Sequence, residues 1–144
     1  IRTIKNFQDV FIVNKEAFHI EDTTFSLEDL LNYPILMLEK NSTTSEYLHN
    51  LFLSHSLDLV PAIELSSNDL LIDLAKIGLG IAFIPDFCIK GDMEGLITLK
   101  TCEELPKRTL VAAYTDQIPL SGAAQYFLDS LDRSDAVEKD TIGE

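Results

Sequence analysis

Three short apolar runs, separated by two amphipathic helical patterns, constrain the fold of this chain more than any other feature. The runs cover residues 34–38 ("PILML"), 60–65 ("VPAIEL") and 80–84 ("GIAFI"), and short runs of this kind are typical of strands in a buried sheet. Between them, residues 43–55 and 66–78 carry apolar side chains at helical spacing. A β-α-β-α-β order with short connections predicts a parallel-rich sheet flanked by helices, and hence an α/β fold.

The start of each predicted helix carries a capping signal. Two pairs have the spacing of a capping box: Ser26 with Asp29, and Thr43 with Glu46. Ser66 or Ser67 caps the helix that follows the second apolar run. These signals predict where each helix begins.

Charge and composition exclude several classes of protein. The chain of 144 residues has 11 Lys and Arg against 24 Asp and Glu, a net charge of −13, which argues against direct DNA contact by this chain. It has no apolar run long enough to span a membrane, and it begins at Ile1 without a signal-peptide pattern. Cys88 and Cys102 make neither a disulfide framework nor a metal-ligand spacing. We therefore expect a fragment of a longer cytoplasmic protein with two reduced thiols.

Polar side chains follow two neighbouring strands of the predicted sheet. Ser42, Thr43 and Thr44 come after the first apolar run, and Ser67 and Asn68 come after the second. Ligands of parallel α/β units bind at the carboxyl ends of the strands, where free N–H groups of the helix starts favour an anion. A cap needs only one hydroxyl, so the excess of hydroxyls at Ser42–Thr44 counts in favour of a ligand site. The alternative is that all of these residues serve only to cap helices.

The sequence offers no catalytic or metal site of a known pattern. His49 and His55 fall within or at the end of one helix, away from its start, and no base and nucleophile stand at a recognisable spacing. Glu64, Asp69 and Asp73 have the residue types of a metal cluster, but the neighbours of Asp69 and Asp73 indicate a solvated helix face. The stretch "GLGIAF" lacks the spacing of a dinucleotide loop. We predict no catalytic residue, no metal and no cofactor.

Three segments in register resemble the effector-binding region of LysR-type transcriptional regulators. They are "SLEDLLNYPILMLEKNSTTSEYLHNLF", "PAIELSSNDLLIDLAKIGLGIAFIP" and "LPKRTLVAAYTDQIPLSGAAQYFLDSL". The resemblance implies a periplasmic-binding-protein-like fold, in which two α/β subdomains flank a cleft and two crossover strands join them. It identifies Asp9–Lys15 as the outgoing crossover strand and Thr109–Thr115 as the returning one.

The resemblance also implies a division of the chain. Residues 1–8 are the tail of an incomplete first subdomain, and residues 9–115 form the second subdomain with the crossover strands. Residues 116–133 are a C-terminal helix that returns to the first subdomain, and residues 134–144 are a polar tail. The DNA-binding head of the family is absent from this sequence.

The function implied is the sensing of a small anionic or polar effector for a DNA-binding transcription regulator. In the family, polar groups at the first helix start contact the effector; Ser42, Thr43 and Thr44 match them, and Ser67 and Asn68 match the next helix start. The partners implied are the effector, further copies of the chain in a homodimer or higher homo-oligomer, and DNA through the missing N-terminal domain only.

Two alternatives stay open, a solute-binding receptor of a transport system with the same fold and, with less support, an α/β enzyme. For the oligomer we predict a surface formed by the helix 43–55, Leu48 included, and the strand 61–65. The alternative for Leu48 is a place in the core.

Overall fold

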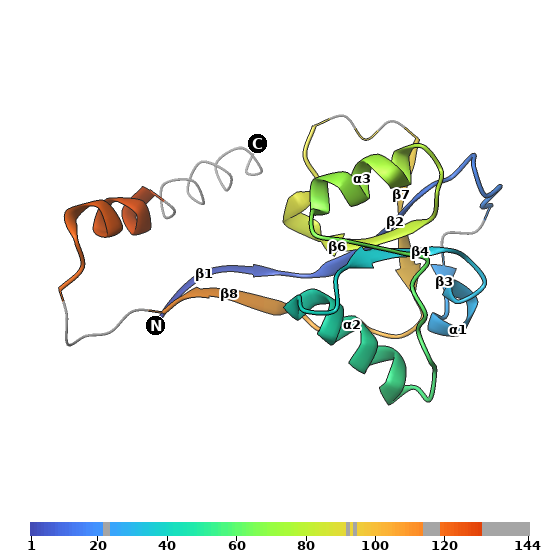
Figure 1. Ribbon diagram of the computed structural model, residues 1–144, viewed down its shortest axis with the longest axis horizontal. Helices are drawn as coiled ribbons and strands as arrows, with labels where there is room; N and C mark the ends of the chain where they lie inside the picture. Colours follow the sequence, from blue (N-terminus) through green and yellow to red (C-terminus); the bar gives the residue numbers. More distant parts are fainter. Residues whose placement is uncertain (22–23, 92, 94, 114–118, 131–144) are drawn as a thin grey trace. The chain divides into compact units, whose positions relative to one another are not determined.

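The computed structural model describes residues 1–21, 24–91, 93, 95–113 and 119–130. The chain forms two compact units, one of Phe7–Lys107 and one of Ile1–Asn6 with Arg108–Glu144 (Figure 1). The predicted tail, 134–144, lies outside the described residues, as do residues 114–115 of the predicted returning strand.

The larger unit is built on a six-stranded sheet with the order β3-β7-β2-β6-β4-β5. The strands are β2 (Asp9–Asn14), β3 (Thr24–Phe25), β4 (Ile35–Leu38), β5 (Ile63–Leu65), β6 (Ile81–Pro85) and β7 (Leu96–Thr101). β4 runs parallel to both β5 and β6, as the β-α-β-α-β pattern predicts. β2 runs antiparallel to β6 and β7, so the sheet is mixed.

Helices cover both faces of this sheet (Figure 1). α1 (Leu27–Leu30) and α2 (Thr43–Ser54) pack on one face, and α3 (Asn68–Lys76) packs on the other. A single 3₁₀ turn, η1 (Asp86–Cys88), follows β6. Within the described part of the chain, no helix is long and apolar enough to cross a membrane.

The central strands are buried on both faces, which explains their continuous apolar sequences. In β4, Ile35 and Met37 point into the core beneath α1 and α2, while Leu36 points into the core beneath α3. Leu48 and Phe52 of α2 complete the first core and are both 0% exposed. The prediction that Leu48 contributes to an oligomer surface is therefore wrong, because this side chain is fully buried under its own helix.

The helix caps agree with the sequence in two helices and differ in the third. Ser26 and Asp29 form the predicted capping box of α1, and Ser67 caps α3. The predicted box of Thr43 with Glu46 is wrong, because Ser42 is the N-cap of α2 and Thr43 is already helical. The Ser42 Oγ accepts a hydrogen bond from the Ser45 N–H at 3.0 Å, the bond that defines this cap.

The smaller unit contains a two-stranded sheet and a helix. β1 (Arg2–Phe7) pairs with β8 (Arg108–Ala112), and the Thr109 Oγ1 donates a hydrogen bond to the Asn6 Oδ1 at 2.9 Å. Of the predicted C-terminal helix, 116–133, residues 122–130 are helical and residues 119–121 are not, while 116–118 and 131–133 lie outside the described residues. The assignment of residues 1–8 to an incomplete first subdomain, and of residues 9–115 to the second, stays a prediction.

The predicted outgoing crossover strand, Asp9–Lys15, overlaps β2, and its role as a crossover stays a prediction. Asp9–Lys15 does not pair with the returning strand; β2 lies inside the six-stranded sheet, and β1 is the partner of β8. Burial explains the difference, because Phe11, Ile12 and Val13 are 0% exposed and need neighbours on both faces of the strand. β1 is more polar and has no buried residue before Phe7.

Candidate functional site

One edge of the six-stranded sheet collects the ends of several strands. β4 and β5 are parallel with Leu38 opposite Leu65, and the Glu39 N–H donates a hydrogen bond to the Leu65 carbonyl oxygen at 2.9 Å. α2 begins shortly after β4, and α3 begins shortly after β5. The two polar helix starts therefore lie at the same edge, which is where parallel α/β units bind ligands.

The hydroxyl groups at the start of α2 lie in different environments: one caps the helix, two belong to buried residues and one belongs to an exposed residue. Ser42 is occupied as the cap, while Thr44 and Ser45 are only 9% and 0% exposed. The Ser45 Oγ is shielded and has no hydrogen-bond partner among the described residues. Thr43 is exposed, and nothing in the described part of the chain hydrogen-bonds its hydroxyl. Of the three predicted residues of this helix start, Thr43 is thus the one that is exposed and does not serve as the cap.

The start of α3 shows the same division. The Ser67 Oγ accepts a hydrogen bond from the Leu70 N–H at 3.3 Å, so this hydroxyl serves the cap. Asn68 is half-buried, and its Oδ1 is shielded without a partner among the described residues. The Glu64 Oε1, on the strand before it, is in the same state. Asn68 is therefore the predicted residue of this helix start whose side-chain oxygen is left without a partner in the described part of the chain.

The first turns of both helices supply further donors. The first N–H groups of a helix have no acceptor within the helix, and the macrodipole places partial positive charge there. In α2, the Ser45 N–H is taken by the Ser42 side chain and the Glu46 N–H by the Ser42 carbonyl oxygen. Such a helix start suits a carboxylate, a phosphate or a polar oxygen.

Sequence reasoning missed one residue at this edge, Asp9. β2 is antiparallel to β6, and the pairing places Asp9 opposite Pro85, the last residue of β6. The Asp86 N–H donates to the Gln8 carbonyl oxygen at 2.9 Å, which holds the two strand ends together. Asp9 is 1% exposed. The available signal was an acidic residue at the head of an apolar strand, but the antiparallel pairing that brings it here spans more than 70 residues.

Cys88 lies just beyond β6 and is half-buried. Burial raises the pKa of its thiol, and the carboxylates of Asp69, Asp9 and Asp86 raise that pKa further, against the opposing effect of Lys90. A thiol in such surroundings stays protonated at neutral pH and is a poor nucleophile.

Metal binding has little support in the described residues. No group of three or more His, Cys, Asp or Glu side chains there lies close enough together to hold a metal ion. Glu64, Asp69 and Asp73 therefore do not converge on one point. The polar groups at this edge are hydrogen-bond donors and acceptors of the kind that bind a polar ligand.

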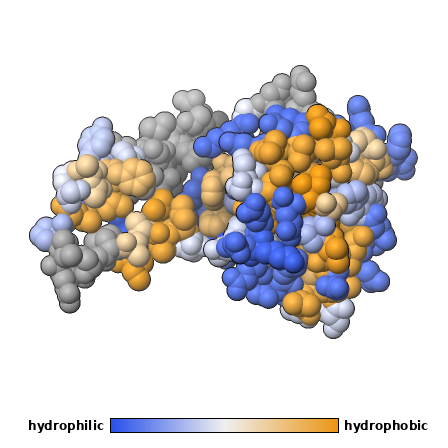
Figure 2. All heavy atoms as spheres, viewed as in Figure 1, coloured by the Kyte–Doolittle hydropathy of each residue, from blue (hydrophilic) through white to orange (hydrophobic). Residues whose placement is uncertain are grey.

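Figure 2 shows hydrophilic side chains gathered over the part of the surface where Figure 1 places the start of α2. Apolar side chains are visible over α3, whose outer surface includes Leu70 and Ile77 at 45% and 70% exposed.

The family model and the related protein sequence point to the same family. The sequence model described as the LysR substrate binding domain matches residues 6–136. The HTH-type transcriptional activator CmpR of Synechocystis sp. (strain ATCC 27184 / PCC 6803 / Kazusa) is 27% identical over 124 residues, which cover 85% of this chain and 41% of that protein. The chain thus spans well under half of that relative.

Solved structures agree with the sequence comparison. The regulatory domain of CcmR from Synechocystis PCC6803, in complex with 2-PG, has a TM-score of 0.70 and 25% identity, with 90% of this chain and 64% of that one covered. The effector binding domain of QuiR in complex with shikimate has a TM-score of 0.71 at 15% identity, covering 92% of this chain and 63% of that one. The second likeness concerns the fold alone, and it supports the predicted periplasmic-binding-protein-like architecture.

Proposed function

Because the chain belongs to the LysR substrate binding domain family, we propose that it senses a small-molecule effector for a DNA-binding transcription regulator. The observation that carries the proposal is the meeting of two polar helix starts at one edge of the sheet, after β4 and after β5. The DNA-binding segment would belong to a part of the protein outside this sequence, consistent with the net charge of −13. The proposed role is binding, without catalysis.

The proposed effector site is the edge formed by Ser42, Thr43, Thr44, Ser67 and Asn68. Thr43 and Asn68 would contact the effector through their side chains, and the first N–H groups of α2 would receive its anionic or polar group. Ser42 and Ser67 would act indirectly, by fixing where the two helices begin. Thr44 is nearly buried and would shape the wall behind them.

Relatives support an effector with a carboxylate or a similar group. Shikimate and benzoate, the ligands named for the QuiR and BenM effector domains, both carry a carboxylate. A carboxylate accepts several N–H bonds at a helix start, and such charge-assisted bonds are about twice as strong as neutral ones. The proposed class for this chain is accordingly a small, water-soluble carboxylate or similarly polar metabolite.

Binding would act on transcription through a change of arrangement. A ligand that binds one orientation of two subdomains more tightly shifts the population toward it. In an oligomer, this shift would alter the spacing of the DNA-binding heads. We place the oligomer surface on the outside of α2 and at the segment before β5, where Leu53 and Val60 are 61% and 78% exposed.

A thermal-shift screen of metabolites against the full-length protein that carries this chain tests the proposal, because a ligand that binds only the native state raises Tm. Thr43→Ala should weaken the hit by about fivefold, the value of one hydrogen bond of about 1 kcal/mol. Thr98→Ala, at an exposed threonine in β7, is the matched control and should bind as the wild type does. A hit whose affinity is the same in Thr43→Ala and Asn68→Ala as in the wild type would place the effector elsewhere.

A further inference from the structure

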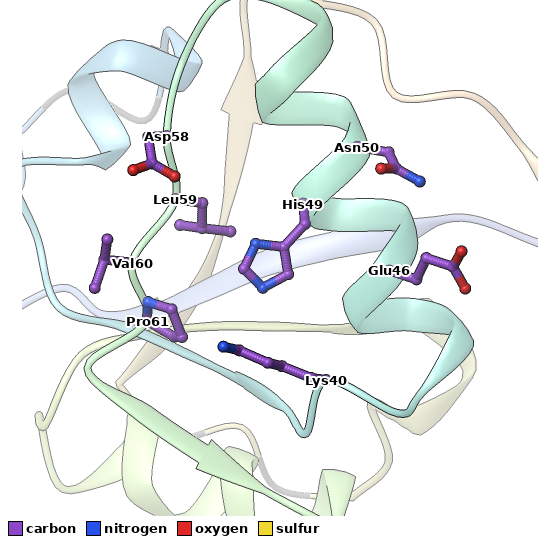
Figure 3. A pocket seen from close by; sticks show the side chains of 8 residues that line it. All are labelled: Lys40, Glu46, His49, Asn50, Asp58, Leu59, Val60 and Pro61. Carbon is purple, nitrogen blue, oxygen red and sulfur yellow. The ribbon is translucent and has the colours of Figure 1, made fainter.

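A hollow lies beside α2, and none of the five residues of the proposed effector site lines it. It has a volume of about 480 Å³ and opens between α2 and the segment that leads into β5 (Figure 3). Its lining residues are Lys40, Glu46, His49, Asn50, Asp58, Leu59, Val60 and Pro61. A volume of this size falls within the range of small-molecule sites in proteins.

Two basic side chains converge in this cavity. Figure 3 shows the His49 ring above the Lys40 side chain, whose ammonium group is directed toward Pro61, and both residues line the cavity. Neither Lys40 nor His49 makes a hydrogen bond or an ion pair with any residue of the described part of the chain. They come from different elements, since Lys40 follows β4 and His49 lies in the middle of α2. The fold, and not local sequence, brings these two donors together.

The His49 ring nitrogen gives a second, independent indication of a ligand. Its Nε2 is shielded from solvent and lacks a hydrogen-bond partner among the described residues. A shielded polar atom without a hydrogen bond destabilises the fold. A ligand oxygen that hydrogen-bonds to this nitrogen would remove that destabilisation. Lys40 is exposed, and its long side chain is free to move aside and admit a ligand.

The remaining walls limit what fits. Leu59 is 4% exposed and, with Pro61, gives this end of the cavity an apolar wall that strengthens electrostatic contacts. Glu46 and Asn50 also line the cavity, and Figure 3 shows their side chains pointing away from the His49 ring. Asp58 lies toward the opposite end of the cavity from Lys40. An anionic group is therefore favoured only where Lys40 and His49 meet, and a large polyanion would meet the carboxylates at the rim.

We propose that this cavity is a second ligand site, which binds one small anion, a carboxylate or a phosphate, between Lys40 and His49. The site is separate from the proposed effector site and does not depend on it. Its occupant forms an ion pair with the Lys40 ammonium group and a hydrogen bond with the His49 ring.

Titration of the ¹⁵N-labelled full chain with inorganic phosphate, and separately with acetate, tests the proposal at constant ionic strength. The ring nitrogens of His19, His49 and His55 are followed by NMR. A saturable shift of the His49 ring nitrogens alone is expected. Saturation by phosphate only, by acetate only or by both identifies the anion class and supports the site.

Two variants make the experiment decisive. Lys40→Met should weaken the binding by about tenfold or more, because a charge-assisted contact is lost. Lys15→Met removes the same charge from an exposed position in a different loop and should leave the affinity unchanged. The proposal is overturned if neither anion gives a saturable His49 shift, or if both lysine variants lose binding equally. It is also overturned if Thr43→Ala abolishes the shift while Lys40→Met does not, since the probe would then occupy the proposed effector site.

Discussion

Ser42 offers the sharpest separation of folding from binding in this molecule. Its Oγ accepts the Ser45 N–H at 3.0 Å and begins the twelve-residue helix α2. Its position also places it at the proposed effector site. Replacement by Ala removes the cap, whereas replacement by Asp keeps a capping oxygen and adds a negative charge.

The magnitudes follow from the cap and the charge. Loss of a serine N-cap costs about 1 kcal/mol, which lowers Tm by roughly 2–6 °C in a chain of this size. Asp is as good a cap as Ser and interacts favourably with the helix N-terminus, so Ser42→Asp should melt at or slightly above the wild-type temperature. Against an anionic effector about 5 Å away, the added charge costs roughly 1–3 kcal/mol, or about fivefold to more than a hundredfold in affinity.

Differential scanning calorimetry measures the Tm of each variant. Titration with the effector found by the thermal-shift screen measures the affinity of each variant. Ser67→Ala, which removes the 3.3 Å cap of α3, is the comparison and should lower Tm by a smaller amount. A Ser42→Ala protein with unchanged Tm would refute the capping argument. A Ser42→Asp protein that binds an anionic effector as tightly as the wild type would show that the anion does not lie at the start of α2.

Three further predictions concern burial and charge. Leu48→Glu should unfold the domain, because the Leu48 side chain is 0% exposed. Leu53→Glu should leave the domain folded, as measured by circular dichroism. If α2 forms the oligomer surface, Leu53→Glu should also weaken self-association in analytical ultracentrifugation. Cys88 should react with iodoacetamide more slowly than the exposed Cys102, because burial and neighbouring carboxylates raise the pKa of the Cys88 thiol. Mass spectrometry of the two cysteine peptides measures both reaction rates. Equal rates would contradict the prediction. Hydrogen bonds from the Ser26 N–H and hydroxyl lower the pKa of Asp29 below 3.8, so the stability that Asp29 adds is present above pH 3.8 and is lost as the pH falls through its lower native pKa. Thermal melts of wild type and Asp29→Ala should therefore differ at pH 6 and converge at strongly acid pH, and a difference that grows on acidification would contradict this sign.

The sequence alone determined the alternating order of β4, α2, β5, α3 and β6 in the larger unit. Runs such as Ile35–Leu38 are apolar at every position because the strand is buried on both faces, and this leaves a clear local pattern. The parallel pairing of β4 with β5 and β6 follows from short β-α-β connections, which have few alternatives. The sequence also identified the edge where α2 and α3 begin, because strand ends and helix starts are local features.

Tertiary structure decided what depends on residues far apart in the chain. Ser42 and Thr43 are both good caps, and only the backbone geometry at the turn after β4 selects Ser42 and leaves the Thr43 hydroxyl exposed. The local sequence of β2 does not reveal its partners, and only the fold pairs this strand with β6 and β7. The meeting of Lys40 with His49 is likewise invisible in sequence, because it depends on how α2 lies on the sheet, and that is fixed by packing of Leu48 and Phe52 in the core.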